Sequence, residues 1–514
     1  MIQQNNQLQV SADHSKVKWL LFCLAIVIFK LLLLAIDPLP KLYLGDSITY
    51  LHTAVSGRIP ADRSFVYGYV IKWLCLRAQS LTPLLIVQSL LGGSIAVIVA
   101  LICRVIFRLP ENVSYVFGFL CATDPLQITW EKYVMTETWS LFFYALMLQQ
   151  SFAYLRNRRL GTLVLIQFLA VMTIGFRMSF FITVQFMAWA LPLIAFLNEN
   201  ATTKTAKRWN LSRLQFLKRA PFWRHLAVSL ATMFLLDQAY QHAYGFLSHR
   251  EPAHLRGSGY FLLAAWAPVL RPSDASDPRL AEIIKHGEEF GLGNITLRNA
   301  QRFAPGGIVD RWSRIETNRR KSNEIATRTA LNALRRDPSA VVGLAAKTYF
   351  VFWTHSIRNM AKLDLGGCCL SDNELATVAN RFHWASRADL RLEPQTLTRW
   401  YYVKASPYLF LVLVSPLLSL ALVFVAPNKQ DSLLIFFHTT VLLTSTLVLA
   451  LYPVPRFLQP LSLLTLLCFA LAVKLLTEKW RTRFESENAV IRVLRCDWQR
   501  DQDARAHKGD FKEP

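Results

Sequence analysis

The sequence predicts an all-α protein that crosses a membrane about ten times. Of its 514 residues, 53% are hydrophobic and only 18% are charged, whereas a soluble protein of this size carries about 25% charged residues. The charged residues lie mostly outside the apolar runs. Many of these runs approach the ~20 residues that a helix needs to cross the hydrocarbon. We expect helices there because an open sheet would leave backbone groups unsatisfied in lipid.

The expected spans follow from the apolar runs. They lie near residues 17–36, 83–103, 112–124, 137–155, 160–176, 179–197, 225–247, 405–426, 431–452 and 456–477. Lys and Arg gather before the first span, after the second, fourth and sixth spans, and after the last. By the positive-inside rule, we expect both termini to be cytoplasmic. The net charge of +23 is explained by these flanking clusters, so we expect no nucleic-acid partner.

The apolar runs also divide the chain into four parts. These are an N-terminal transmembrane module (1–247), an extracytoplasmic, mostly helical soluble domain (248–404), C-terminal transmembrane helices (405–477) and a cytoplasmic tail (478–514). The first outward loop, 37–82, alternates polar and aromatic residues in a near-helical rhythm, which predicts helices lying in the membrane interface.

Asp46 lies in that outward loop, about ten residues beyond the first span, in the stretch Gly45-Asp46-Ser47. A carboxylate at a membrane boundary can accept a proton from a hydroxyl group, as a general base does, or it can hold a divalent cation. The alternative is that Asp46 only caps a helix that starts at Ser47.

A second group of acids lies in the next outward loop and comprises Asp124, Glu131 and Glu137. Glu137 opens a very apolar helix, where a carboxylate is favourable for the helix dipole, and Thr136 is the expected cap. This loop and the first face the same side, so Asp46 and Glu137 could converge on one cavity.

Basic residues supply the third part of the predicted site. Arg177 lies in a tight outward turn between two spans, and Arg456 follows Pro455 at the outer edge of the last span. Arginine binds phosphate bidentately and keeps its charge when partly buried, although an arginine at a helix end commonly just snorkels to the surface. Lys72 faces the same region, and Lys30, in the outer half of the first span, is expected to snorkel outward.

The chain lacks the sequence motifs of several other classes. We find no Walker-type phosphate loop, no dinucleotide-binding fingerprint and no His or Cys spacing typical of zinc. The sequence therefore gives no sign of ATP, NAD or zinc chemistry.

Taken together, these motifs resemble the GT-C glycosyltransferases, which include protein mannosyltransferases and the lipid A aminoarabinose transferase. The resemblance rests on the outward Gly-Asp-Ser, the Met-Thr-Glu-Thr at 135–138, Arg177 in its hairpin and the run Pro455-Arg456-Phe457-Leu458. It covers most of 15–200 and 405–477 and is weak over 248–404.

The resemblance implies an enzyme of the inner (cytoplasmic) membrane that contacts membrane lipids. It would transfer a sugar from a polyprenyl-phosphate donor to a hydroxyl of a glycan, lipid or protein acceptor, on the side away from the cytoplasm. A divalent metal ion held by Asp46 is one implied cofactor; otherwise none is expected. The first-loop acid stands alone here, without the Asp-Glu pair of protein mannosyltransferases, which favours a bacterial-type acceptor. The implied roles are: catalysis, Asp46 and Glu137; donor-phosphate binding, Arg456, Arg177 and Lys72; other donor or acceptor contacts, Tyr50, Asp124 and Glu131.

Other classes remain open at the level of sequence. A transporter or flippase for lipid-linked glycans would place ionisable residues near the middle of the bilayer and use broken helices. A polysaccharide polymerase or ligase would share the lipid donor but depend on the large outward loop. A membrane scaffold without catalysis is the remaining alternative.

Overall fold

The computed structural model describes residues 2–197, 217, 219–365, 376, 380–382, 396–426 and 429–481. Within these ranges the elements are helices joined by loops, and β pairing is limited to one isolated bridge, between Lys41 and Tyr133. The prediction of an all-α protein is confirmed. The predicted tail lies outside the described residues from 482 onward.

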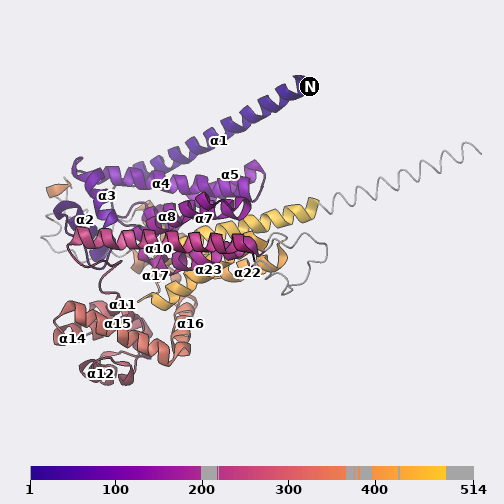
Figure 1. The fold of residues 1–514 in the computed structure, drawn as a ribbon. Helices are drawn as coiled ribbons and strands as arrows, with labels where there is room; N and C mark the ends of the chain where they lie inside the picture. Colours follow the sequence, from indigo (N-terminus) through magenta and orange to yellow (C-terminus); the bar gives the residue numbers. More distant parts are fainter. Residues whose placement is uncertain are drawn as a thin grey trace, which may run out of the picture.

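Long helices form a bundle that makes up the body of the molecule (Figure 1). They are α1 (Ile2–Ile36), α4 (Thr82–Leu101), α5 (Glu111–Ala122), α7 (Glu137–Asn157), α8 (Leu160–Phe176), α9 (Phe181–Phe196), α10 (Ala220–Ser248), α22 (Ser415–Val425), α23 (Lys429–Leu449) and the last segment, Pro455–Arg481.

Short elements gather at one end of the bundle and position the site. They are α2 (Leu44–Ser56), α3 (Val66–Ile71), the π-helical turn Lys72–Leu76, α6 (Pro125–Trp130), α17 (Ile357–Asp364), α20 (Leu397–Ala405), α21 (Leu409–Leu413) and the 3₁₀ turn Pro455–Leu458 that opens the last segment.

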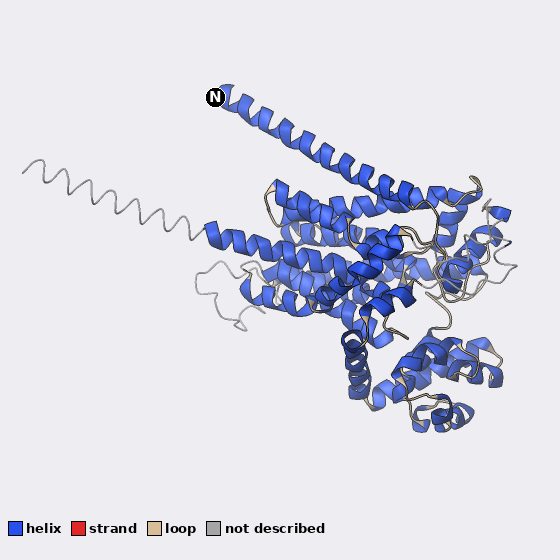
Figure 2. Ribbon diagram, turned by 180° about the vertical axis from the view of Figure 1, so that it is seen from behind, coloured by secondary structure: helices blue, strands red, loops and turns tan. Residues whose placement is uncertain are grey.

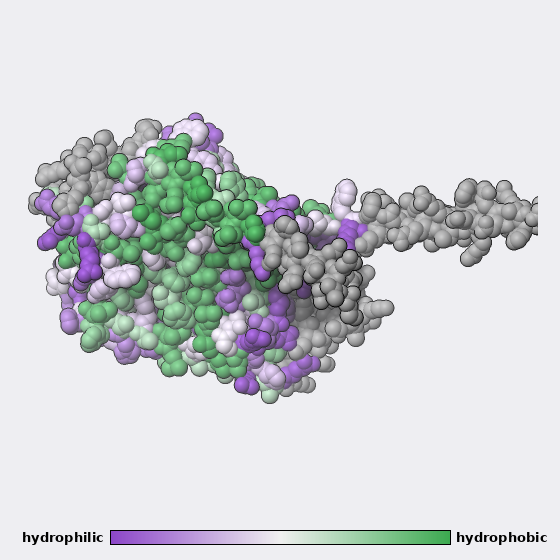
Figure 3. Space-filling view, turned by 90° about the horizontal axis from the view of Figure 1, so that it is seen from above, coloured by the Kyte–Doolittle hydropathy of each residue, from purple (hydrophilic) through white to green (hydrophobic). Residues whose placement is uncertain are grey.

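Five helices in the described part of the chain are long and apolar enough to cross a membrane: Ser15–Ile36, Thr82–Ile106, Met178–Phe196, Lys429–Leu449 and Pro455–Arg481. A sixth span is formed if Leu397–Leu413 and Ser415–Val425, which meet at a bend of 42°, cross together. Apolar side chains cover much of the bundle surface, and polar ones gather toward its two ends (Figure 3). These features make the chain a multi-pass membrane protein, while the count of ten spans stays a prediction.

The remaining helices form a separate lobe beside one half of the bundle (Figures 1 and 2). They are α11 (Ser258–Ala265), α12 (Pro278–Lys285), α13 (Arg298–Phe303), α14 (Ile308–Ile315), α15 (Arg319–Arg336) and α16 (Pro338–Thr354). The lobe has its own apolar core, which includes Trp266 and Trp312. Both ends of the described chain lie on the side of the bundle away from α2 and α3 (Figures 1 and 2).

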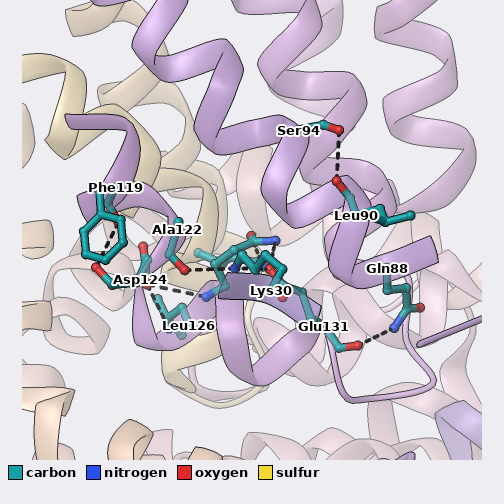
Figure 4. A network of polar contacts seen from close by, with 12 residues as sticks. Lys30, Gln88, Leu90, Ser94, Phe119, Ala122, Asp124, Leu126 and Glu131 are labelled. Atoms are coloured by element: carbon teal, nitrogen blue, oxygen red, sulfur yellow. Dashed lines mark hydrogen bonds and ion pairs between the residues drawn. The ribbon is translucent and has the colours of Figure 1, made fainter. Parts of the chain in front are cut away.

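Lys30 of α1 points into the bundle, so the prediction that it snorkels outward is wrong (Figure 4). Its Nζ donates to Glu131 Oε1 at 2.6 Å and to the Ala122 carbonyl at 2.9 Å. Gln127 Nε2 donates to the same Glu131 oxygen at 3.1 Å. A charged side chain in a span is costly unless it is paired, and this pair fastens α1 to the end of α6, within the second outward loop.

Asp124 fixes the same loop at its start. Its Oδ1 accepts the Leu126 backbone N–H at 2.8 Å and so caps α6, which has Pro125 at its first position. The Tyr408 hydroxyl donates to Asp124 at 2.8 Å, and the Ser462 hydroxyl donates to its second oxygen. Asp124 and Glu131 therefore hold α6, and with it the loop that leads to Glu137.

Replacing Gly92 by alanine should destabilise the protein. A Cβ at Gly92 in α4 would lie 1.8 Å from Glu131 Oε1, so the carboxylate could not keep its place beside Lys30. We expect a loss of about 1–3 kcal/mol, measured as a lower unfolding midpoint of the purified protein. Gly161→Ala is the matched control, because a Cβ at that position meets nothing within 4 Å. Equal midpoints for the two variants would contradict the close approach.

Candidate functional site

The two loops that carry the predicted acids are hydrogen-bonded to each other. The Lys41 N–H donates to the Lys132 carbonyl at 2.8 Å, and the Val134 N–H donates to the Lys41 carbonyl at 2.9 Å. The Ser47 hydroxyl adds a bond of 2.9 Å to the Val134 carbonyl. This pairing brings the start of α2 beside the start of α7.

Asp46 lies in the first turn of α2, whose N-cap is Tyr43. The Asp46 side chain makes no capping bond, so the interpretation of Asp46 as a helix cap is wrong. Its Oδ1 lies 2.7 Å from Arg63 Nη2, and its Oδ2 lies 3.6 Å from Arg456 Nη1. The side chain is 21% exposed, which leaves it within reach of a molecule outside the protein.

Glu137 opens α7 and is almost completely buried. Its Oε1 lies 3.6 Å from Arg177 Nη2 and 3.9 Å from Arg456 Nη1, and its Oε2 has no hydrogen-bond partner. Thr136 occupies the N-cap position, as expected, although its side chain makes no capping bond. The acid is thus held by charge alone, at distances too long for a hydrogen bond.

The two arginines keep unused hydrogen-bond donors inside the protein. The Arg456 guanidinium lies over the Tyr43 ring, 4.1 Å from its centroid, and its Nε and Nη1 have no hydrogen-bond partner. The Nη1 and Nη2 atoms of Arg177 are likewise buried without a partner, and burial lowers the pKa of this group. Buried polar groups are nearly always satisfied, so several free donors on two neighbouring guanidinium groups indicate a place for an oxygen-rich anion.

Asp364, at the end of α17, is a member of this site that sequence reasoning missed. Its Oδ2 accepts the Arg456 backbone N–H at 2.7 Å and the Tyr402 hydroxyl at 3.2 Å, while its Oδ1 has no partner. Burial raises the pKa of the Asp364 carboxyl to about 6. A carboxylate at a helix C-terminus opposes the helix dipole, so its position is explained by the neighbouring arginine and not by the stability of α17.

Arg63 was also missed, although it lies in the predicted outward loop. The only sequence signal was its place beside Asp62, whose carboxylate lies 3.8 Å from the Arg63 guanidinium. No signal pointed to Asp364, because it belongs to the part of the chain that was predicted to be a soluble domain.

Tyr50 is buried beside the two acids. Its ring packs edge-on against Tyr67 at 5.0 Å, and its hydroxyl interacts with Thr136. Burial, reinforced by the negative charge of Asp46 and Glu137, raises the pKa of the Tyr50 hydroxyl. Tyr50 therefore stays neutral and can donate a hydrogen bond at neutral pH.

The structure brings Asp46, Tyr50, Glu137, Arg177 and Arg456 into one cluster. It places the other three predicted site residues elsewhere. Lys72 is exposed on a π-helical turn, with its Nζ 6.0 Å from the Tyr69 ring, and Asp124 and Glu131 belong to the network that holds α6.

The surroundings of Asp46 suit an anion better than a cation. Its two charged neighbours are the guanidinium groups of Arg63 and Arg456, which would repel a metal ion at the same position. Among the residues that the structure describes, no group of three His, Cys, Asp or Glu side chains is placed to hold a metal. A metal contact by Asp46 stays a prediction.

No protein-family model, curated protein or solved structure matches this chain. Its function must therefore be argued from the site.

The raised pKa of Asp364 predicts a pH dependence of stability. Because its pKa is 3.8 in a model compound and about 6 when folded, the native protein binds this proton more tightly than the unfolded chain. This contribution to the free energy of unfolding is fully present below the unfolded pKa and is lost as pH rises through the folded value. The loss is at most about 3 kcal/mol.

The side chain in Asp364→Asn cannot titrate, so the stability of this variant should not decrease for this reason between pH 4 and 7. The measurement is the unfolding midpoint at each pH. Glu288→Gln, on the exposed surface of the lobe, should keep the wild-type profile. A wild-type profile in Asp364→Asn would show that this carboxyl does not titrate in that range.

Proposed function

We propose that the protein is a membrane glycosyltransferase that moves a sugar from a polyprenyl-phosphate donor to an acceptor hydroxyl on the extracytoplasmic side. The observation that supports the proposal most is the convergence of two acids and two arginines from four distant segments, with unused donors on both guanidinium groups. The resemblance to GT-C enzymes was based on these same residues.

The arginines suit the donor phosphate. In the reaction, the bond between the sugar C1 and a phosphate oxygen breaks, and that oxygen keeps the electron pair. Arg456 and Arg177 can donate their free N–H groups to the phosphate oxygens and stabilise the charge that develops there. A lipid-linked donor would arrive from within the bilayer, so no nucleotide-binding loop is needed.

Asp46 suits the role of general base. Its carboxylate is the more accessible of the two acids, since Glu137 is only 2% exposed. As the acceptor oxygen forms its bond to C1, its proton passes to Asp46. Glu137 faces both arginines and orients them.

The finer architecture is part of the same proposal. Helices α7 and α10, with 21 and 29 residues, are also long enough to cross the ~30 Å of hydrocarbon at 1.5 Å per residue. Counting them and the shorter helices gives a GT-C-type arrangement of about ten spans, in the inner membrane, with both termini cytoplasmic.

Two observations favour a transporter for lipid-linked glycans as the second candidate. The Lys30–Glu131 pair lies inside the bundle, and one pair of helices is bent by 42°. Oε1 of Glu131 already accepts from Lys30 and Gln127, however, whereas the buried donors of Arg177 and Arg456 have no hydrogen-bond partner. A transporter would move the lipid-linked sugar without forming a new glycosidic bond, which the following experiment detects.

Asp46→Asn should reduce sugar transfer at least 100-fold, since removal of a general base typically costs about 10²–10⁴ in rate. Transfer is measured in vesicles as radiolabelled sugar that becomes covalently attached to the acceptor fraction. Asp62→Asn removes a neighbouring carboxylate of the same loop and should retain most activity. Full activity of Asp46→Asn would rule out Asp46 as the base.

Arg456→Ala should raise the KM for the lipid donor tenfold or more, because each 1.4 kcal/mol of lost binding is a factor of ten. Arg456→Lys should restore only part of the lost donor affinity, since lysine cannot make the bidentate contact. Arg58→Ala, an exposed arginine of the first loop, is the control. An unchanged KM in Arg456→Ala would remove Arg456 from the donor site.

A further inference from the structure

Helix α16, which was predicted to be part of a soluble domain, carries an apolar stripe on its exposed side. Val342, Ala346, Phe350 and Trp353 are all exposed, and Phe350 is 61% accessible. Their spacing of four, four and three residues places them on one face of the helix. A soluble domain has no reason to present such a face to water.

The opposite side of α16 is buried in two cores. Val341 and Leu344 pack into the core of the lobe, while Ala345 and Phe352 belong to the core of the bundle. The helix is thus apolar nearly all round, with Lys347 as its one charged residue. A helix of this kind is found in protein cores or in membranes.

The neighbouring helix α15 shows what a water-facing surface looks like in the same lobe. Its exposed positions include Arg320, Glu324 and Arg328. Within one lobe, the exposed side of α15 is therefore charged, whereas the exposed side of α16 is apolar.

The apolar stripe continues onto the surface of the bundle. Trp353 stacks on Phe410 with ring centroids 5.0 Å apart, and the Tyr349 hydroxyl donates to the Leu413 carbonyl at 3.2 Å. Leu411 and Leu417 extend the exposed apolar surface along the bent helix pair. In both ribbon views, α16 runs across the direction of the bundle helices (Figures 1 and 2), as a helix lying in the membrane plane would.

We propose that α16 lies in the membrane interface and contacts the bilayer with Val342, Ala346, Phe350 and Trp353. The occupant of this face is phospholipid, whose acyl chains would cover the stripe as they cover the adjoining bundle surface. Trp353 is a residue type enriched at this depth, and Lys347 can reach the headgroups. The lobe is then fastened to the bilayer by α16 as well as to the bundle.

Site-directed spin labels test this placement in phospholipid nanodiscs. A ketone-bearing amino acid introduced at Ala346 or Phe350 would carry the label, which avoids the native cysteines. Power saturation then compares collisions with oxygen, which concentrates in lipid, and with a water-soluble nickel chelate. Glu324 and Arg328 on α15 are the matched control positions.

At Ala346 and Phe350 we expect collisions with oxygen to exceed those with nickel several-fold, and the reverse at the two control positions. Control-like values at Ala346 and Phe350 would overturn the proposal, because the stripe would face water. Low accessibility to both reagents would also overturn it, because a protein or a second copy of the chain would then cover the stripe. The measurement needs no activity, so its outcome is separate from whether the protein transfers a sugar.

Discussion

The structure of the site depends on how Arg456 is held. Its backbone N–H is bound by Asp364, and its guanidinium lies over the Tyr43 ring and faces Asp46 and Glu137. One residue therefore connects the first outward loop, the second outward loop and the segment that follows the lobe. Burying charge is costly without compensation, and here acids and arginines compensate one another while leaving donors unused. The surrounding helices can be understood as the frame that keeps these segments together.

The sequence was sufficient for the features that depend on local composition. Apolar runs predicted helices that cross a membrane, and the shared side of the two loops allowed Asp46 and Glu137 to converge on one cavity. The sequence did not reveal which charged groups pair with each other. Lys30 was expected to reach the surface because its partner Glu131 lies 101 residues away, and Asp364 lay in a region without a recognisable motif. A single sequence predicts burial from its own neighbourhood and does not reveal which partner satisfies a charge.

The boundary between membrane and soluble parts shows the same limit. The segment 248–404 was assigned to water because no run in it is long enough to span a bilayer, yet α16 has an exposed apolar face. Only the structure distinguishes that face from the one packed into two cores. Helix α17 begins three residues after α16 ends and carries Asp364 at its last position. The proposed lipid contact is thus linked to the site through a short, continuous segment.

The pair formed by Lys30 and Glu131 also has a consequence for biosynthesis. A ribosome completes α1 well before it makes Glu131, which lies 101 positions after Lys30. If α1 enters the lipid at once, the lysine does so without its counter-ion, at a cost of about 2.5–3.5 kcal/mol on insertion scales for a central position. The apolar side chains of this 22-residue span offset that cost on the same scales, so α1 can enter the bilayer first. The later arrival of α6 then supplies the counter-ion and fastens α1 to the rest of the bundle.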